Sequence, residues 1–198
     1  MHAATQGQMD EEIAATAAIS RRVATELVAC PYPDAHGEAV AQLAGRVAAR
    51  LAVPPDTIRA VVVGALVHDI GKLTIDVAVL EKPTHLDADE WRLIERHPHE
   101  GARLVSGVFA DEVVAVVRWH HERWDGTGYP DALPGAAIPL EARVVAVADA
   151  FRAMREQRPY RAPVPEREAL SELERGAGMQ WDPVCVEALL SVVATGDA

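Results

Sequence analysis

Apolar residues recur through most of the chain with the period of an α-helix, and prolines and glycines interrupt that pattern at intervals. The segment 57–69 is almost wholly apolar, so we expect its helix to lie at the centre of the fold. Asp56, Asp87 and Asp182 precede helical segments and are predicted N-caps, and Pro183 suits a first helical position. The pattern predicts helices over residues 10–30, 36–51, 57–69, 88–96, 98–108, 110–121, 140–157, 165–175 and 183–193.

Two internal stretches depart from the helical pattern. Residues 73–83 are predicted to be extended or irregular, and residues 123–139, which are rich in glycine and proline, to form one ordered loop. Residues 1–9 are predicted to be disordered, residues 10–35 to form an N-terminal helix and linker, and residues 36–194 to form one domain. We therefore expect an all-α fold, a single helical bundle.

Composition agrees with this expectation and limits the partners. Hydrophobic residues make up 49% of the 198 residues and aromatic residues only 5%, so the core must consist mainly of alanine, valine and leucine. Alanine and leucine are good helix formers, whereas clusters of aromatic and β-branched residues are typical of strands. The net charge of −11 opposes binding to a nucleic-acid polymer. A phosphate ligand would therefore need a local cluster of basic residues.

The chain shows no signal-peptide pattern and no apolar run long enough to span a membrane. Cys30 and Cys185 are far apart in the sequence and form no CxxC motif, which favours free thiols in a reducing compartment. We expect a cytoplasmic protein with no membrane partner.

Histidines and aspartates near predicted helix ends suggest a metal site. A single histidine on an apolar face is usually a packed core residue, but five of them together with two aspartates are harder to explain in that way. Asp149 lies within an apolar helical segment, where a carboxylate needs hydrogen bonds or a metal ion. His2, His85 and His99 are given no role. The candidate ligands are His36, His68, Asp69, His97, His120, His121 and Asp149.

Imidazoles and carboxylates together suit divalent ions such as manganese, iron or zinc. Mixed sets of this kind build two-metal centres, in which the ions stabilise both the attacking and the leaving oxygen of a phosphoryl transfer. The residues therefore favour cleavage of a phosphoester over a purely structural metal site.

Several further residues could bind a phosphate ligand. Lys72 follows Gly71, which is predicted to end a helix, and can reach a phosphate oxygen or protonate a leaving oxygen, although a lysine at a helix end is often only a surface residue. Tyr129 offers a ring for stacking on a base, or is an ordinary packed tyrosine. Four arginines recur at intervals of three: Arg152, Arg155, Arg158 and Arg161. The last two flank a stiff Pro-Tyr turn and suit phosphate better than the first two, which are expected at a helix C-terminus in any case.

The order of these motifs resembles the HD-GYP subgroup of the HD-domain phosphohydrolases. The resemblance covers residues 36–193 and rests on HDIGK (68–72), HPHEG (97–101), HHERWDGTGYP (120–130), ADAF (148–151) and RPYR (158–161). It implies an HD-type helical bundle with an ordered GYP loop. It also implies a bacterial signalling enzyme that hydrolyses cyclic di-GMP to pGpG or GMP, with a hydroxide activated by two metal ions, commonly iron or manganese.

The resemblance also implies individual roles. The seven candidate ligands named above match the metal ligands of the family, and Asp69 would bridge the two ions. Lys72 matches a lysine near the scissile phosphate. The remaining matches form the loop and the phosphate contacts expected for cyclic di-GMP: Gly128, Tyr129, Pro130, Arg158 and Arg161.

Three departures from the family pattern keep other interpretations open. Tyr32 stands where some members have a glutamate that binds a third metal, so we expect two ions. RAMREQRPYR replaces the usual DALTSDRPYR, which puts Arg152 in place of an acidic residue close to Asp149. The chain has no room for a sensor domain, so regulation would come from signalling partner proteins, from expression or from the short N-terminal helix. A homodimer is a further expected partner. The alternatives are a catalytically weak or inactive module that binds cyclic di-GMP or a protein, and an HD phosphohydrolase for another cyclic dinucleotide.

Overall fold

The structure, a computed structural model, describes residues 35–157 and 162–196 of the chain. The predicted disordered segment 1–9, almost all of the predicted helix and linker 10–35, and both Arg158 and Arg161 lie outside the described residues. The elements are α2 (Ala35–Arg50), α3 (Pro55–Val67), the 3-10 helix η1 (Ile70–Thr74), α4 (Val77–Leu80), α5 (Ala88–Ile94), α6 (His97–Val105), α7 (Asp111–Trp119), the 3-10 helix η2 (Gly135–Ala137), α8 (Leu140–Arg155), α9 (Glu166–Gly176) and α10 (Pro183–Ala194).

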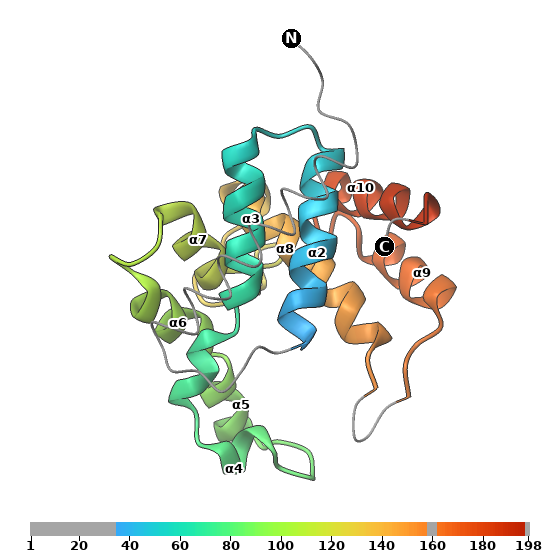
Figure 1. Ribbon diagram of the computed structural model, residues 1–198. Helices are drawn as coiled ribbons and strands as arrows, with labels where there is room; N and C mark the ends of the chain where they lie inside the picture. Colours follow the sequence, from blue (N-terminus) through green and yellow to red (C-terminus); the bar gives the residue numbers. More distant parts are fainter. Residues whose placement is uncertain (1–34, 158–161, 197–198) are drawn as a thin grey trace.

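Helices α2, α3 and α8 form the centre of the bundle (Figure 1). Helices α9 and α10 pack on the α2 and α8 side, and α6 and α7 pack on the α3 side. The short helices α4 and α5 lie at the edge of the molecule and bury no residue of their own. Within the described ranges there is no β-strand, only isolated bridges. The predicted all-α fold is confirmed.

Small aliphatic side chains build the core, as the composition indicated. On α2 the buried residues Val40, Leu43 and Val47 follow the three- and four-residue spacing of one helix face. They belong to the main cluster with residues of α3, α8 and α10, of which Phe151 is the largest side chain fully buried. A smaller cluster lies between α3, α6 and α7.

Several details of the prediction needed correction. The segment 73–83, predicted to be irregular, contains part of η1 and the helix α4. Helix α3 ends at Val67, before Gly71, and Asp56 lies in its first turn while Pro54 occupies the N-cap position. Asp87 and Asp182 cap α5 and α10 as predicted, and Asp87 forms a full capping box. The predicted domain limits of 36 and 194 stay a prediction.

Gly71 has a function in packing rather than in ending a helix. A Cβ atom at this position would lie 1.9 Å from the carbonyl oxygen of His97 and 2.6 Å from the backbone nitrogen of Gly101. No other residue type allows η1 to approach α6 so closely. The contact holds the segment after α3 directly against the start of α6, where the next ligand candidate stands.

Backbone hydrogen bonds join the loop over residues 123–139 to the turn between α9 and α10. Trp124 and Asp125 donate their N–H groups to Gln180 and Met179 in the turn between α9 and α10, at 3.1 and 2.8 Å. In the part of the chain that the structure describes, no helix is both long enough and apolar enough to cross a membrane.

Candidate metal centre

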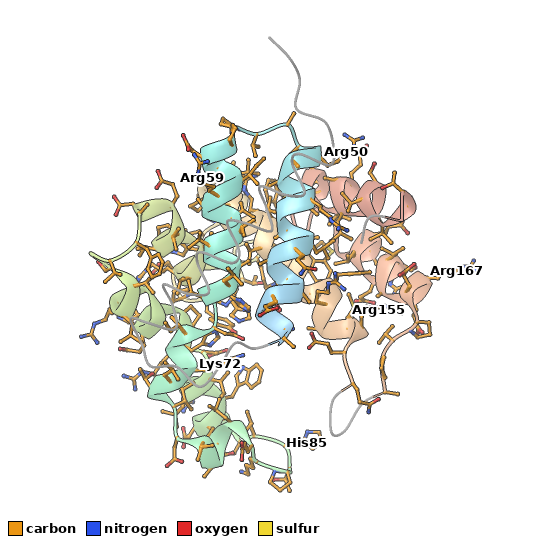
Figure 2. All side chains as sticks on the ribbon, viewed as in Figure 1. Arg50, Arg59, Lys72, His85, Arg155 and Arg167 are labelled. Carbon is orange, nitrogen blue, oxygen red and sulfur yellow. The ribbon has the colours of Figure 1, made fainter. Side chains whose placement is uncertain are left out.

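The candidate ligands come from five parts of the bundle. His36 is the second residue of α2, and His68 and Asp69 follow α3 directly. His97 is the first residue of α6, His120 and His121 follow α7, and Asp149 lies on α8. The prediction extended the α7 helix through His121, but the helix ends at Trp119. His85 and His99, which were given no role, are exposed, and His85 lies at the outer edge of the molecule (Figure 2).

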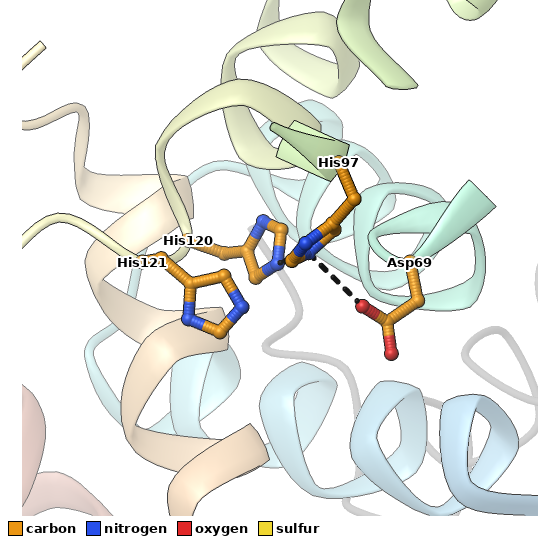
Figure 3. A group of neighbouring side chains, drawn as sticks. All are labelled: Asp69, His97, His120 and His121. Atoms are coloured by element: carbon orange, nitrogen blue, oxygen red, sulfur yellow. Dashed lines mark hydrogen bonds and ion pairs between the residues drawn. The ribbon is translucent and has the colours of Figure 1, made fainter. Parts of the chain in front are cut away.

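The ligand atoms form two groups that share one carboxylate. The imidazole-rich group consists of Asp69, His97, His120 and His121 (Figure 3). The carboxylate-rich group consists of His36, His68 and Asp69, together with Asp149, whose Oδ1 lies 2.9 Å from His36 Nε2. In the imidazole-rich group, the ligand atoms all lie within 4.8 Å of one another. The same holds for the carboxylate-rich group when Asp149 is left out. Asp69 is therefore the residue able to bridge two ions.

Hydrogen bonds to main-chain carbonyls fix the tautomer of three of the histidines. Nδ1 of His68 lies 2.7 Å from Ala65 O, and Nδ1 of His97 lies 2.7 Å from Ile94 O. Nδ1 of His120 lies 3.0 Å from Val117 O. A carbonyl oxygen can only accept a hydrogen bond, so each Nδ1 must carry the proton. In the neutral imidazole Nε2 is then left with a lone pair.

These lone pairs face other electron-rich atoms. His97 Nε2 lies 3.3 Å from His120 Nε2 and 3.2 Å from Asp69 Oδ1, and His68 Nε2 lies 3.4 Å from Asp69 Oδ2. Such contacts are repulsive unless a proton or a cation lies among them. Within the residues described, neither ring nitrogen of His121 has a hydrogen bond, so it too can act as a ligand. Imidazoles that donate the N–H group of their other ring nitrogen to a carbonyl oxygen are typical metal ligands. The donor set therefore fits divalent ions.

Burial keeps two rings of the imidazole-rich group in the neutral form. Burial lowers the pKa of His120 well below its ordinary value, and repulsion by the His121 ring acts in the same direction. Burial, with a contribution from His97, also lowers the pKa of His121 to about 3. For Asp69, burial opposes ionisation, but electrostatic interaction with the His68 ring and the contact with His97 keep its pKa well below the ordinary range. At neutral pH this group therefore offers the neutral imidazoles of His120 and His121 and the carboxylate of Asp69.

His36 has the opposite character. Burial would lower its pKa, but hydrogen bonds with Asp149 and Glu156 outweigh that effect and raise the pKa to about 9. Glu156 Oε1 lies 2.7 Å from His36 Nδ1. Burial likewise opposes the charge of Asp149, while the hydrogen bond with His36 lowers the pKa of this carboxylate. In the absence of metal, His36 therefore carries a proton at neutral pH.

Lys72 lies at the open side of the centre. Its Nζ is 2.5 Å from Asp69 Oδ2, and its side chain is 41% exposed. The ammonium group is thus both in contact with the shared carboxylate and accessible to a ligand from solvent.

The GYP loop packs directly on the imidazole-rich group. The Tyr129 ring stacks on the His121 ring, with centroids 4.9 Å apart and planes at 28°, and the Tyr129–Pro130 peptide bond is cis. A Cβ atom on Gly128 would lie 2.4 Å from the backbone nitrogen of Arg123, so only glycine fits there. Burial raises the pKa of Tyr129, so its hydroxyl stays protonated.

Sequence reasoning missed Glu122, which holds this loop in place. Its buried carboxylate accepts hydrogen bonds from the backbone N–H groups of Asp131, at 2.7 Å, and Leu133, at 3.0 Å. Asp131 in turn accepts from the Arg118 guanidinium and from Trp119 Nε1. The available signal was an ionisable residue between a histidine pair and a glycine-rich loop.

Arg152 and its neighbours do not form a simple surface patch. Nε of Arg152 is the one buried side-chain polar atom without a hydrogen-bond partner in the described part of the chain. Burial, with repulsion by Arg46, lowers the pKa of Arg152. Arg155 is directed away from Arg152, because its Nη1 donates to Val164 O at 3.1 Å.

A cavity of about 220 Å³ extends from His121 and Asp149 to Gln180 and Trp181.

Comparisons with known proteins show the family. The model of the HD domain family matches residues 13–184, and the chain therefore belongs to that family; its motifs are those of the HD-GYP subgroup. The structure is similar to that of Bd1817, a HDG"Y"P protein from Bdellovibrio bacteriovorus, with a TM-score of 0.66 and 22% identity over 95% of this chain and 64% of that one. At this identity the likeness shows the fold.

Curated relatives share more sequence. The chain is 44% identical over 156 residues to the cyclic di-GMP phosphodiesterase response regulator RpfG of Xanthomonas campestris, covering 77% of this chain and 41% of the relative. It is 37% identical over 160 residues to the 3'3'-cGAMP-specific phosphodiesterase 3 of Vibrio cholerae, covering 80% of this chain and 35% of the relative. The chain thus spans well under half the length of these two relatives.

Proposed function

We propose that this chain is a metal-dependent phosphodiesterase that hydrolyses cyclic di-GMP to pGpG or GMP. The observation that carries the proposal is the pair of ligand groups joined through Asp69 beside the GYP loop. The names of relatives such as RpfG support this substrate. Divalent ions held there, which we propose to be two ions of iron or manganese, would supply an activated water and offset charge on the phosphoryl oxygens.

The chain's own residues have distinct parts in this proposal. Asp69 and the surrounding imidazoles hold the ions, and Asp149 completes the carboxylate-rich group. Lys72 is close enough to the centre to donate a proton to the departing 3′ oxygen, and its exposure leaves room for the substrate. Gly128, Tyr129 and Pro130 form one wall of the ligand site. Arg158 and Arg161 are proposed to bind the phosphates of the ligand on the strength of the sequence.

The test uses the full chain, purified without oxygen and loaded with Fe²⁺ or Mn²⁺. Cyclic di-GMP is followed by chromatography, and pGpG or GMP should accumulate over several turnovers. His68→Ala should abolish product formation while the helical circular dichroism spectrum is unchanged. Full turnover by that variant would contradict the proposal.

A second candidate substrate is another cyclic dinucleotide. It is favoured by the 37% identity to a 3'3'-cGAMP-specific enzyme, which is close to the values for several cyclic di-GMP enzymes. A panel of cyclic di-GMP, 3'3'-cGAMP and cyclic di-AMP at equal concentration separates the two, because the preferred substrate should have the highest kcat/KM.

A third candidate is a binding module without turnover, favoured by the buried, unpartnered Nε of Arg152, which stands three positions after Asp149. Tight binding of cyclic di-GMP with bound metal but no product would support it. We propose that the protein acts in the cytoplasm, in keeping with the free thiol of Cys185. We also propose that its activity is regulated by partner proteins or by its own dimerisation.

A further inference from the structure

We propose that Glu156 is a positioning residue for the carboxylate-rich group and orients His36 toward the metal ion there. The inference rests on the proposed metal centre. Glu156 belongs to the segment in which this chain departs from the family motif, where the family's usual DALTSDRPYR reads RAMREQRPYR. It is not one of the matched ligand positions.

His36 is held differently from the three histidines of fixed tautomer. In His68, His97 and His120 the Nδ1 nitrogen is bonded to a carbonyl oxygen three residues earlier in the chain, and Nε2 is directed into the centre. In His36 the Nδ1 nitrogen lies 2.7 Å from Glu156 Oε1, and Nε2 points to Asp149. Glu156 therefore stands at the position that a main-chain carbonyl occupies for the other three rings.

A carboxylate in this position has a stronger effect than a carbonyl. An ionised acceptor forms a shorter and stronger hydrogen bond with an imidazole N–H, and it makes the opposite nitrogen a better electron donor. It also fixes the rotation of the ring about its side-chain bonds. His36 is partly buried, with its side chain 13% exposed, so water has limited access to the ring.

The local structure presents Glu156 for this contact. It follows the last residue of α8 with an extended backbone, and its N–H donates to Arg152 O at 3.0 Å. The carboxylate is thereby turned across to the first turn of α2. The neighbouring arginine on its own helix, Arg155, is directed instead to Val164 O and to Glu166, at 3.1 and 3.8 Å. Arg155 thus does not compete with His36 for the Glu156 carboxylate.

Glu156 is a positioning residue rather than a ligand because it contacts the nitrogen of His36 that faces away from Asp149. We therefore expect the ion of the carboxylate-rich group to bind about 10- to 100-fold more weakly in Glu156→Ala, the usual range when such a hydrogen-bond partner is removed. The affinity of Glu156→Gln for this ion should lie between those of the unchanged protein and Glu156→Ala, because an amide oxygen still accepts a hydrogen bond from Nδ1. The ion held by the imidazole-rich group should bind as in the unchanged protein.

The experiment titrates metal-stripped protein with Mn²⁺ and follows bound ions by calorimetry and electron paramagnetic resonance. Glu166→Ala is the matched control, because it removes a carboxylate near the same end of α8 without contacting His36. Weakening of one of two ions in Glu156→Ala, with no change in the control, is the expected result. Unchanged binding of both ions would overturn the proposal. Complete loss of one ion in Glu156→Gln would also overturn it, since that result would make Glu156 a ligand.

A second readout does not depend on metal. In the metal-free protein the Nδ1 proton of His36 should give a slowly exchanging, strongly deshielded signal in ¹⁵N-edited NMR spectra, which disappears in Glu156→Ala and persists in Glu166→Ala. Absence of that signal from the unchanged protein would overturn the positioning role. If the signal and the weakened ion are found but no cyclic dinucleotide is hydrolysed, the proposed function fails while this inference stands.

Discussion

The two ligand groups of the centre use the same kinds of residue but hold them in opposite states. In the imidazole-rich group, burial and mutual repulsion keep His120 and His121 neutral. In the carboxylate-rich group, the acids around His36 keep it protonated until the pH approaches about 9. An ion entering the first group meets free lone pairs, whereas an ion entering the second must displace a proton. How readily one of these histidines binds a metal ion therefore depends on the charged and apolar groups around its ring.

The largest expected effect concerns Asp69, which the two ligand groups share. Asp69→Asn keeps the shape of the side chain but removes the charge shared by both groups, so both ions should bind poorly. We expect hydrolysis to fall by at least about 10⁴-fold, because the ions are proposed to activate the nucleophile as well as to offset charge. Metal analysis and chromatography of the product measure this. Two tightly bound ions in the variant would show that Asp69 is not the bridge.

Removing one ligand from each group separates them. His121→Ala should remove the ion of the imidazole-rich group and leave the other, and His36→Ala should do the reverse. Both should reduce turnover by about 10²-fold or more, since a centre with one ion stabilises only one of the two oxygens involved. Bound metal per chain and electron paramagnetic resonance of the remaining Mn²⁺ distinguish the variants. Loss of both ions in both variants would mean that the two groups act as one site.

The neutral histidines should make the metal-free protein sensitive to acid. The pKa of His121 is about 3 in the fold against an ordinary 6.5, and that of His120 is also well below 6.5. Between pH 6 and 4 the unfolded chain therefore binds more protons than the folded one. The free energy of unfolding should decrease as the pH falls, on the order of 1 kcal/mol per pH unit for each histidine.

His36 adds little in this window, because below pH 6 it is protonated in the folded state and mostly protonated in the unfolded chain. Urea unfolding of metal-stripped protein at pH 6, 5 and 4 measures the slope. His121→Asn should reduce the slope by the contribution of one histidine, most clearly between pH 6 and 5, because aspartates of lowered pKa such as Asp69 add to it near pH 4. A slope unchanged in that variant would contradict the assignment to the imidazole-rich group.

The smallest expected effect concerns the affinity of the carboxylate-rich group. Because an ion there displaces the proton of His36, its affinity should rise by about tenfold per pH unit from pH 7 and level off near pH 9. The imidazole-rich group should show no such rise. Calorimetry in two buffers of different ionisation enthalpy counts the protons released. Equal proton release by both ions would remove the distinction between the groups.

The fold and the candidate ligands were largely predictable from the sequence because each depends on local signals. Asp87 and Asp182 mark helix starts, and aliphatic spacing marks the buried faces of α2 and α8. The helix α4 was missed because it has four residues and buries none of them.

The relations between distant residues were not predictable. His36 and Glu156 are 120 positions apart and meet only because α2 packs on α8, so the sequence carries no sign of their contact. The reason for Gly71 was also wrong in the prediction, because close approach of two backbones depends on tertiary packing. The predicted roles of the ligands, of Lys72 and of the loop stay predictions until the variants are measured.

The contact between Gly71 and the start of α6 has a consequence for how sequence variation in this protein should be interpreted. Position 71 has no group that could bind an ion or transfer a proton, yet even one added carbon would push against the His97 backbone. In a survey of random substitutions it should tolerate as little change as the ligands beside it. Such a survey would group together residues that do the chemistry and a residue that only gives them room.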